Sequence, residues 1–169
     1  MFAEDNFADA YRPLNGALTI GQMFSFDIAV NFRNGNKGVD VFAADGSTQI
    51  FNFNVGSDDY LHNGSSISNN TYSADTEFSF KFTQTSATAG TYEITRSGTF
   101  SGTDSGTYTG AIGAFKFYNG NTDGGSENDL YFNNLSVVPE VSSYALFGVF
   151  LFVVGGGRFV RRFLFARSP

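Results

Sequence analysis

The chain has 169 residues, a formal net charge of −6, an apolar content of 41% and no cysteine. Its first 138 residues hold six Lys and Arg against fifteen Asp and Glu, which gives them a net charge of −9. This acidic balance excludes nucleic-acid binding, which requires a basic surface, and the lack of Cys excludes disulfides and thiol chemistry. The length is enough for one domain with a hydrophobic core.

Alternating apolar residues predict strands along most of the chain. Residues 2–14 are weakly patterned, and we expect a loop there that leads to an edge strand. From Phe24 to Phe32 apolar residues alternate with polar or small ones, a period of two that predicts a strand with one buried face. Further strands are expected at residues 39–43, 48–55, 76–83, 91–96, 99–100, 107–109, 111–118 and 129–138, with loops at 56–70 and 119–128.

This pattern of about eight to ten short strands, separated by Gly and Asn turns, predicts an all-β antiparallel sandwich. The closing segment, Asn128 to Val137, resembles the last strand of lectin-like and carbohydrate-module jelly rolls. The shared features are an Asp, an aromatic residue, an Asn pair and an apolar end. The resemblance implies a jelly-roll, concanavalin-like sandwich, and such folds frequently bind glycans, although a fold alone does not establish a function.

The last thirty residues have a different composition. Residues 141–157 carry no charge. As a helix they would span about 26 Å, enough for one pass through a thin bilayer. Arg158, Arg161 and Arg162 follow, and basic residues beside a span are retained on the cytoplasmic side. We therefore expect an extracytoplasmic sandwich domain at residues 1–138 and a membrane-associated segment at residues 139–169.

This tail, with Val138, Pro139 and Glu140 before its apolar run, resembles the PEP-CTERM sorting signal of Gram-negative, biofilm-forming bacteria. In that family a Pro-Glu-Pro motif precedes a short membrane helix and an Arg-rich end. The resemblance implies processing by an exosortase-type membrane protease and delivery to the cell surface or extracellular matrix, with anchoring by the C-terminal helix beforehand. Val141 stands where the second proline is usual. An ordinary C-terminal anchor and a buried apolar helix are the alternatives.

The first residues lack the basic and apolar regions of a secretory signal peptide. Since a C-terminal sorting signal requires export, we expect the natural N-terminus to lie further upstream, either at an earlier start or within a longer protein.

The sequence offers little for catalysis. His62 is the only histidine, and no Gly-x-Ser-x-Gly elbow accompanies it, so a serine triad is not expected. Asp75 and Glu77 form the only acidic pair spaced by two at a strand start, and we expect them to be edge charges that discourage strand pairing. The prediction is that the protein is not an enzyme. A small secreted enzyme is kept as a rival.

A calcium ion is the candidate cofactor. Asn119, Asn121 and Asp123 place oxygen-bearing side chains at alternate positions before a glycine, as in the first half of a calcium loop. Glu127 and Asp129 lie close to the place of the missing bidentate glutamate. Asn-Gly and Asp-Gly are also good turn formers, so a plain turn is the alternative.

Sugar binding would need aromatic platforms and amide or carboxylate partners. Tyr60, Tyr118 and Tyr131 lie in or near segments rich in Asn and Asp and are the candidate platforms, while the absence of Trp counts against them.

Taken together, the residues and the two resemblances predict an exported, non-catalytic protein with a structural or adhesive role in the polysaccharide layer. The alternative is a carbohydrate-binding accessory domain at the C-terminus of a larger secreted glycoside hydrolase. The expected partners are the exosortase-type protease, the cytoplasmic membrane and a polysaccharide.

Overall fold

The structure is a computed structural model that describes residues 1, 7–56 and 59–138. Residues 139–169 are not among those described. The predicted membrane span at residues 141–157 therefore lies outside the described residues. Within the described part of the chain, no helix is long and apolar enough to cross a membrane.

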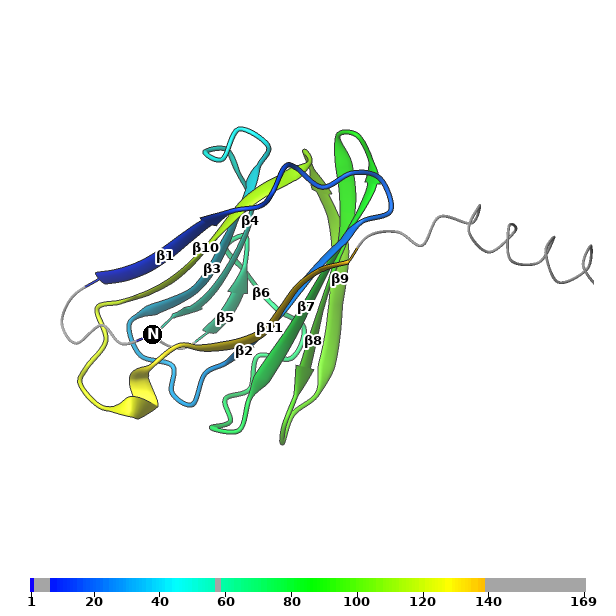
Figure 1. The fold of residues 1–169 in the computed structure, drawn as a ribbon. Coiled ribbons are helices and arrows are strands. Elements are labelled where there is room, and N and C mark those ends of the chain that lie inside the picture. Colours follow the sequence, from blue (N-terminus) through cyan, green and yellow to red (C-terminus); the bar gives the residue numbers. More distant parts are fainter. Residues whose placement is uncertain (2–6, 57–58, 139–169) are drawn as a thin grey trace, which may run out of the picture. The chain divides into compact units, whose positions relative to one another are not determined.

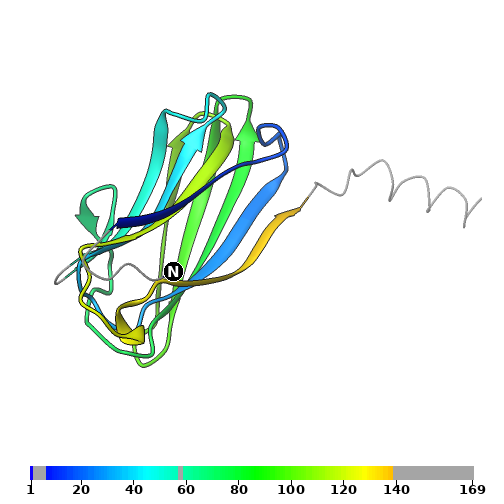
Figure 2. The same cartoon turned by 60° about the vertical axis from the view of Figure 1, so that its left-hand side comes forward.

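The described strands form two antiparallel sheets that face each other (Figure 1; Figure 2). The all-β sandwich prediction is confirmed. The six-stranded sheet has the order β1-β10-β3-β4-β5-β6, and the five-stranded sheet has the order β11-β2-β7-β8-β9. The strands are β1 (Phe7–Pro13), β2 (Met23–Ala29), β3 (Asn36–Ala43), β4 (Gln49–Gly56), β5 (Asp59–His62), β6 (Ser65–Ser66), β7 (Glu77–Ser86), β8 (Ala89–Ser97), β9 (Gly102–Thr109), β10 (Ile112–Gly120) and β11 (Tyr131–Val138), with a short 3-10 helix η1 (Ser126–Asn128) before the last.

Phenylalanine side chains fill the space between the sheets. The period of two places every second residue of β2, β4, β7 and β10 on the inner face. The rings meet across the two sheets, with centroids 4.8 Å apart for Phe53 and Phe78 and 5.2 Å apart for Phe26 and Phe117. Burying one such side chain contributes about 2 kcal/mol, so this aromatic layer holds the sandwich together.

Sequence-based expectations for four segments were wrong. Residues 99–100, expected to be a strand, lie in the connection between β8 and β9. The strand from Phe24 ends at Ala29, and Phe32 is 45% exposed because the chain has left the sheet there. The region 56–70, expected to be a loop, contains β5 and β6, which extend the sheet beyond β4. Residues 7–13, expected within a loop, form β1, which pairs along its whole length with β10.

Candidate functional site

A polar cluster lies on the outer face of the six-stranded sheet, away from the aromatic core. Asp40 of β3 is flanked in the sequence by Val39 and Val41, which are fully buried on the inner face. Alternation along the strand therefore turns Asp40 outward. The register places it beside Lys116 of β10 on one side and Asn52 of β4 on the other.

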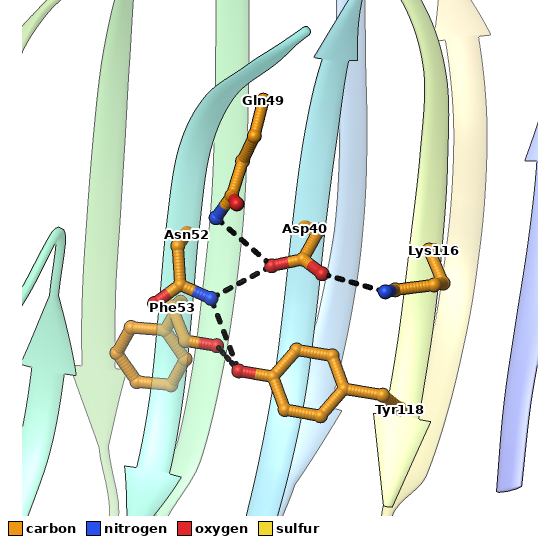
Figure 3. A network of polar contacts seen from close by, with 6 residues as sticks. All are labelled: Asp40, Gln49, Asn52, Phe53, Lys116 and Tyr118. Carbon is orange, nitrogen blue, oxygen red and sulfur yellow. Dashed lines mark hydrogen bonds and ion pairs between the residues drawn. The ribbon is translucent and has the colours of Figure 1, made fainter. Parts of the chain in front are cut away.

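The Asp40 carboxylate is the centre of this cluster (Figure 3). Its Oδ2 lies 3.0 Å from Lys116 Nζ, and this is the only ion pair in the described part of the chain. Its Oδ1 accepts hydrogen bonds from Asn52 Nδ2 at 2.8 Å and from Gln49 Nε2 at 3.1 Å. The exposed fractions of the Asp40 and Lys116 side chains are 12% and 25%, so the pair is partly shielded from water and still reachable from it.

Tyr118 closes one side of the cluster. Its hydroxyl accepts from Asn52 Nδ2 at 3.1 Å and donates to the main-chain oxygen of Phe53 at 3.2 Å. Desolvation raises the pKa of Tyr118 to about 12, so the phenol stays protonated and acts as a donor. A Cβ atom at position 38 would lie 1.9 Å from the main-chain oxygen of Phe53 and 3.1 Å from the Tyr118 hydroxyl. The first distance is a severe clash, so the strand requires Gly38 here.

Aromatic rings border the cluster. Phe7 stacks on Tyr118 with centroids 6.3 Å apart, and Tyr11 contacts Phe42 with centroids 5.9 Å apart. Phe7 is 57% exposed. The face thus combines one carboxylate, two amides and one ammonium group with apolar rings at its margin. Such donors can stabilise negative charge on a bound group.

The sequence contains a signal for this cluster that was missed. Each central polar residue stands between two buried apolar ones, in Val39-Asp40-Val41, Phe51-Asn52-Phe53 and Phe115-Lys116-Phe117. That pattern identifies outward-facing side chains, but it does not say which strands are neighbours.

The three candidate tyrosine platforms do not form a common surface. Tyr60 is fully buried, and its ring lies between the guanidinium groups of Arg33 and Arg96, each 4.8 Å from the ring centroid. Tyr118 belongs to the polar cluster of the six-stranded sheet. Tyr131 is 43% exposed on β11 of the other sheet, where its hydroxyl donates to the main-chain oxygen of Ser126.

His62 does not lie in a polar surface loop, as its sequence neighbours suggested. It belongs to β5, and its ring centroid is 4.7 Å from that of Phe51. Its Nδ1 lies 3.3 Å from the Tyr92 hydroxyl, and burial lowers the pKa of His62. Asp75, which was also considered for catalysis, lies in the turn before β7 and accepts hydrogen bonds from Thr99. The expectation that Asp75 and Glu77 are edge charges was wrong, because β7 lies inside its sheet and pairs with both β2 and β8.

The five candidate calcium ligands have different surroundings. Asn119 is fully buried, whereas Asn121 and Glu127 are exposed. Asp123 accepts a hydrogen bond from Asn34 at 2.7 Å. Asp129 is half-buried, and its Oδ1 is buried without a hydrogen-bond partner.

Among the described residues, no group of three His, Cys, Asp or Glu could hold a metal ion. Calcium binding stays a prediction, and comparison of the melting temperature with and without a chelator checks it.

Of the predicted processing motif, Val138 is the exposed last residue of β11. Pro139 and Glu140, and the arginines at 158, 161 and 162, lie outside the described residues.

No family model matches the chain, and no curated protein matches it. A comparison with solved structures found peptidases. SCP-B, a member of the eqolisin family of peptidases, in complex with the tripeptide Ala-Ile-His, has a TM-score of 0.43 and 17% identity over 82% of this chain and 76% of that chain.

Scytalido-glutamic peptidase has a TM-score of 0.42 in two complexes. With a peptide-based transition state analog the identity is 15%, over 82% of this chain and 76% of that chain. With a transition state analog inhibitor the identity is 16%, over 82% of this chain and 77% of that chain.

The prediction of a non-catalytic structural or adhesive protein, with its accessory-domain alternative, is contradicted by these comparisons, because the chains found to be similar are peptidases. The prediction that the protein is not an enzyme is contradicted in the same way. At these TM-scores and identities, neither a catalytic residue nor a substrate is transferred to this chain.

Proposed function

We propose that the outer face of the six-stranded sheet is a hydrolytic site for acyl bonds, with peptide bonds as the substrate class. The observation that carries the proposal is the Asp40 carboxylate, held outside the core between the amide of Asn52 and the ammonium of Lys116. Glycoside hydrolysis generally uses two carboxylates. Acyl hydrolysis needs one base together with donors for an oxyanion, which is what this cluster contains.

Each residue of the cluster has a role in this proposal. Asp40 accepts the proton of the attacking water. Lys116 Nζ donates to the oxyanion that develops on the carbonyl oxygen. The two hydrogens of Asn52 Nδ2 point at Asp40 and at the Tyr118 hydroxyl, so this amide holds the base in place. Tyr118 positions the Asn52 amide through their 3.1 Å contact. Gln49 is exposed and makes the longer of the two amide contacts to Asp40, so a water molecule can replace it while the other contacts persist.

The test is peptide turnover by the purified full-length chain, measured with a peptide library from about pH 3 to pH 8. Asp40→Asn keeps the shape of the side chain but removes the base, and we expect kcat/KM to fall by about a hundredfold or more. Glu77→Gln, a matched change at an exposed position on the other sheet, should leave turnover unchanged. Absence of turnover by the unaltered protein, or equal turnover by Asp40→Asn, would contradict the proposal.

We also propose that the protein is exported and sorted through its C-terminal segment. The support is the order of the Val138-Pro139-Glu140 motif, the uncharged residues 141–157 and the arginines after them. The partners are then an exosortase-type protease and the cytoplasmic membrane, and the final location is the cell surface or the surrounding matrix. A polysaccharide partner is proposed on the same grounds.

Cell fractionation tests this sorting proposal. Pro139→Ala and Glu140→Ala should leave the uncleaved chain in the membrane fraction, whereas Ser142→Ala should be released like the unaltered protein. Release of all three variants at equal rates would count against recognition of the motif.

We further infer a jelly-roll topology for the sandwich. This topology is supported by five connections that pass from one sheet to the other, namely β1–β2, β2–β3, β6–β7, β9–β10 and β10–β11.

A further inference from the structure

A buried lysine lies inside the sandwich, near the start of β3. Lys37 is 0% exposed and follows the inward alternation of Val39 and Val41. Its Nζ donates to the main-chain oxygens of Phe32 at 3.0 Å and Asn128 at 2.7 Å. Within the described residues it takes part in no ion pair. Burying an ammonium group without a paired carboxylate costs several kcal/mol.

This burial changes the chemistry of the amine. Desolvation lowers the pKa of Lys37 to about 8, although the charge of Asp129 acts in the opposite direction. A lysine with a lowered pKa is a free amine for an appreciable fraction of the time near neutral pH, and the free amine is a nucleophile.

An amide group lies beside this amine. Lys37 and Asn119 are Cα partners in the antiparallel pairing of β3 with β10. The Cβ atoms of such partners are about 4.5–5.5 Å apart on the same face of the sheet. Asn119 is also 0% exposed, and its Nδ2 lies 3.3 Å from the main-chain oxygen of Asn128. The amine of Lys37 and the amide of Asn119 therefore contact the same carbonyl oxygen.

A carboxyl group lies near the amine, because Asp129 follows Asn128 in the chain and its charge acts on Lys37. The Oδ1 atoms of Asn119 and Asp129 are both buried without a hydrogen-bond partner, which is unfavourable for a buried polar group. A carboxyl group beside the amine can carry a proton from it to the leaving nitrogen.

We propose that Lys37 and Asn119 join in an intramolecular isopeptide bond, with Asp129 as the proton carrier. Lys37 Nζ attacks the amide carbon of Asn119 and forms a C–N bond. The bond from that carbon to Nδ2 then breaks, and Nδ2 leaves with the proton given up by Lys37 as one molecule of ammonia. Asp129 transfers this proton and ends in the state in which it began. No oxidant or other reactant is needed.

The product resolves the unfavourable features of the cluster. The buried amine becomes part of a neutral amide, so the cost of burying its charge disappears. β3 and β10, next to each other in the six-stranded sheet, become covalently linked where the sheet carries Asp40 and Lys116. The reaction requires the folded state, because only the sheet register brings residues 37 and 119 together.

Intact mass spectrometry of the denatured full-length chain tests the proposal. We expect a mass lower than that of the sequence by one ammonia, and a joined peptide pair containing Lys37 and Asn119 after proteolysis. Asn119→Asp should lose one water in place of ammonia. Asn119→Ala, Lys37→Arg and Asp129→Asn should have their full sequence masses. Asn121→Ala, an exposed asparagine in the adjoining loop, should lose ammonia as the unaltered protein does.

Two results would overturn the proposal. One is a full sequence mass for the unaltered protein. The other is a loss of ammonia that persists in Lys37→Arg, because a cyclic imide at Asn119-Gly120 also releases ammonia and does not need the lysine. Circular dichroism of Asp129→Asn shows whether that variant is folded. A joined peptide pair in a folded Asp129→Asn chain would remove Asp129 from the reaction.

Discussion

At the scale of single residues, phenylalanine rings of the two sheets pack directly against one another. Phe80 shows this best, because it lies 4.8 Å from Phe26, its cross-strand neighbour, and 4.9 Å from Phe53 of the opposite sheet. A ring held on both sides cannot be shortened without leaving a cavity, since the surrounding rings relax only in part.

Phe80→Ala should therefore lower the free energy of unfolding by about 3–5 kcal/mol. Phe32→Ala, at a position that is 45% exposed, is the matched control and should change it by less than about 1 kcal/mol. Urea denaturation measures both. Equal effects would show that the rings between the sheets are not the main source of stability.

His62 gives a residue-scale prediction for pH. Burial lowers its pKa in the folded state, so the folded protein binds this proton less readily than the unfolded chain. Its contribution is fully present above the unfolded pKa of about 6.5 and is lost as the pH falls below it. We expect the free energy of unfolding to decrease between about pH 7 and pH 5 more steeply in the unaltered protein than in His62→Gln.

Urea titrations at several pH values measure this difference. Parallel profiles for the two proteins would show that His62 does not titrate differently in the folded state.

At the scale of elements, one buried amide joins the β7–β8 hairpin to the start of β10. Gln84 is fully buried, and both ends of its side chain are hydrogen-bonded, as required of a buried polar group. Its Nε2 donates to the main-chain oxygens of Ser86, Ala89 and Gly110, and its Oε1 accepts from the Tyr108 hydroxyl and the Ile112 amide.

Gln84→Met keeps the volume and removes these contacts. Several buried donors and acceptors then lose their partner, and each such loss costs about 1–3 kcal/mol. Two unsatisfied groups already cost about 2 kcal/mol, so we expect the free energy of unfolding to fall by at least about that amount. Faster amide hydrogen exchange in residues 84–89 should accompany it. Gln49→Met, an exposed position with one side-chain contact, should cost about 1 kcal/mol or less. Unchanged exchange in the hairpin would contradict this role for Gln84.

At the scale of the whole molecule, the sandwich has its own core within residues 1–138. Every residue of the hydrophobic core cluster lies before Tyr131, and the last strand adds an edge to the five-stranded sheet. We expect a chain ending at Val138 to unfold cooperatively and to give a β-rich circular dichroism spectrum. Its melting temperature should lie within about 4 °C of that of the full chain, the shift produced by 1 kcal/mol. A helical spectrum or a non-cooperative transition would contradict this.

The sequence by itself determined the local features. Alternation in Phe24-Ser25-Phe26-Asp27-Ile28 and in Phe78-Ser79-Phe80 predicted β2 and β7 and their buried faces, because a strand's period of two is written in neighbouring residues. It failed at β5, since Asp59–His62 is short and polar at its ends and becomes a strand by pairing with β4. For the same reason His62 was placed in a loop.

Only the tertiary structure decided the two clusters. Asp40, Asn52 and Lys116 are far apart in the chain, as are Lys37 and Asn119, and each set meets through the order β10-β3-β4 and its register. Strand order and register depend on non-local pairing, and a shift of one residue would turn every side chain to the other face. The pattern of single strands therefore states which side chains face outward or inward, while the assembled sheet determines which of them become neighbours.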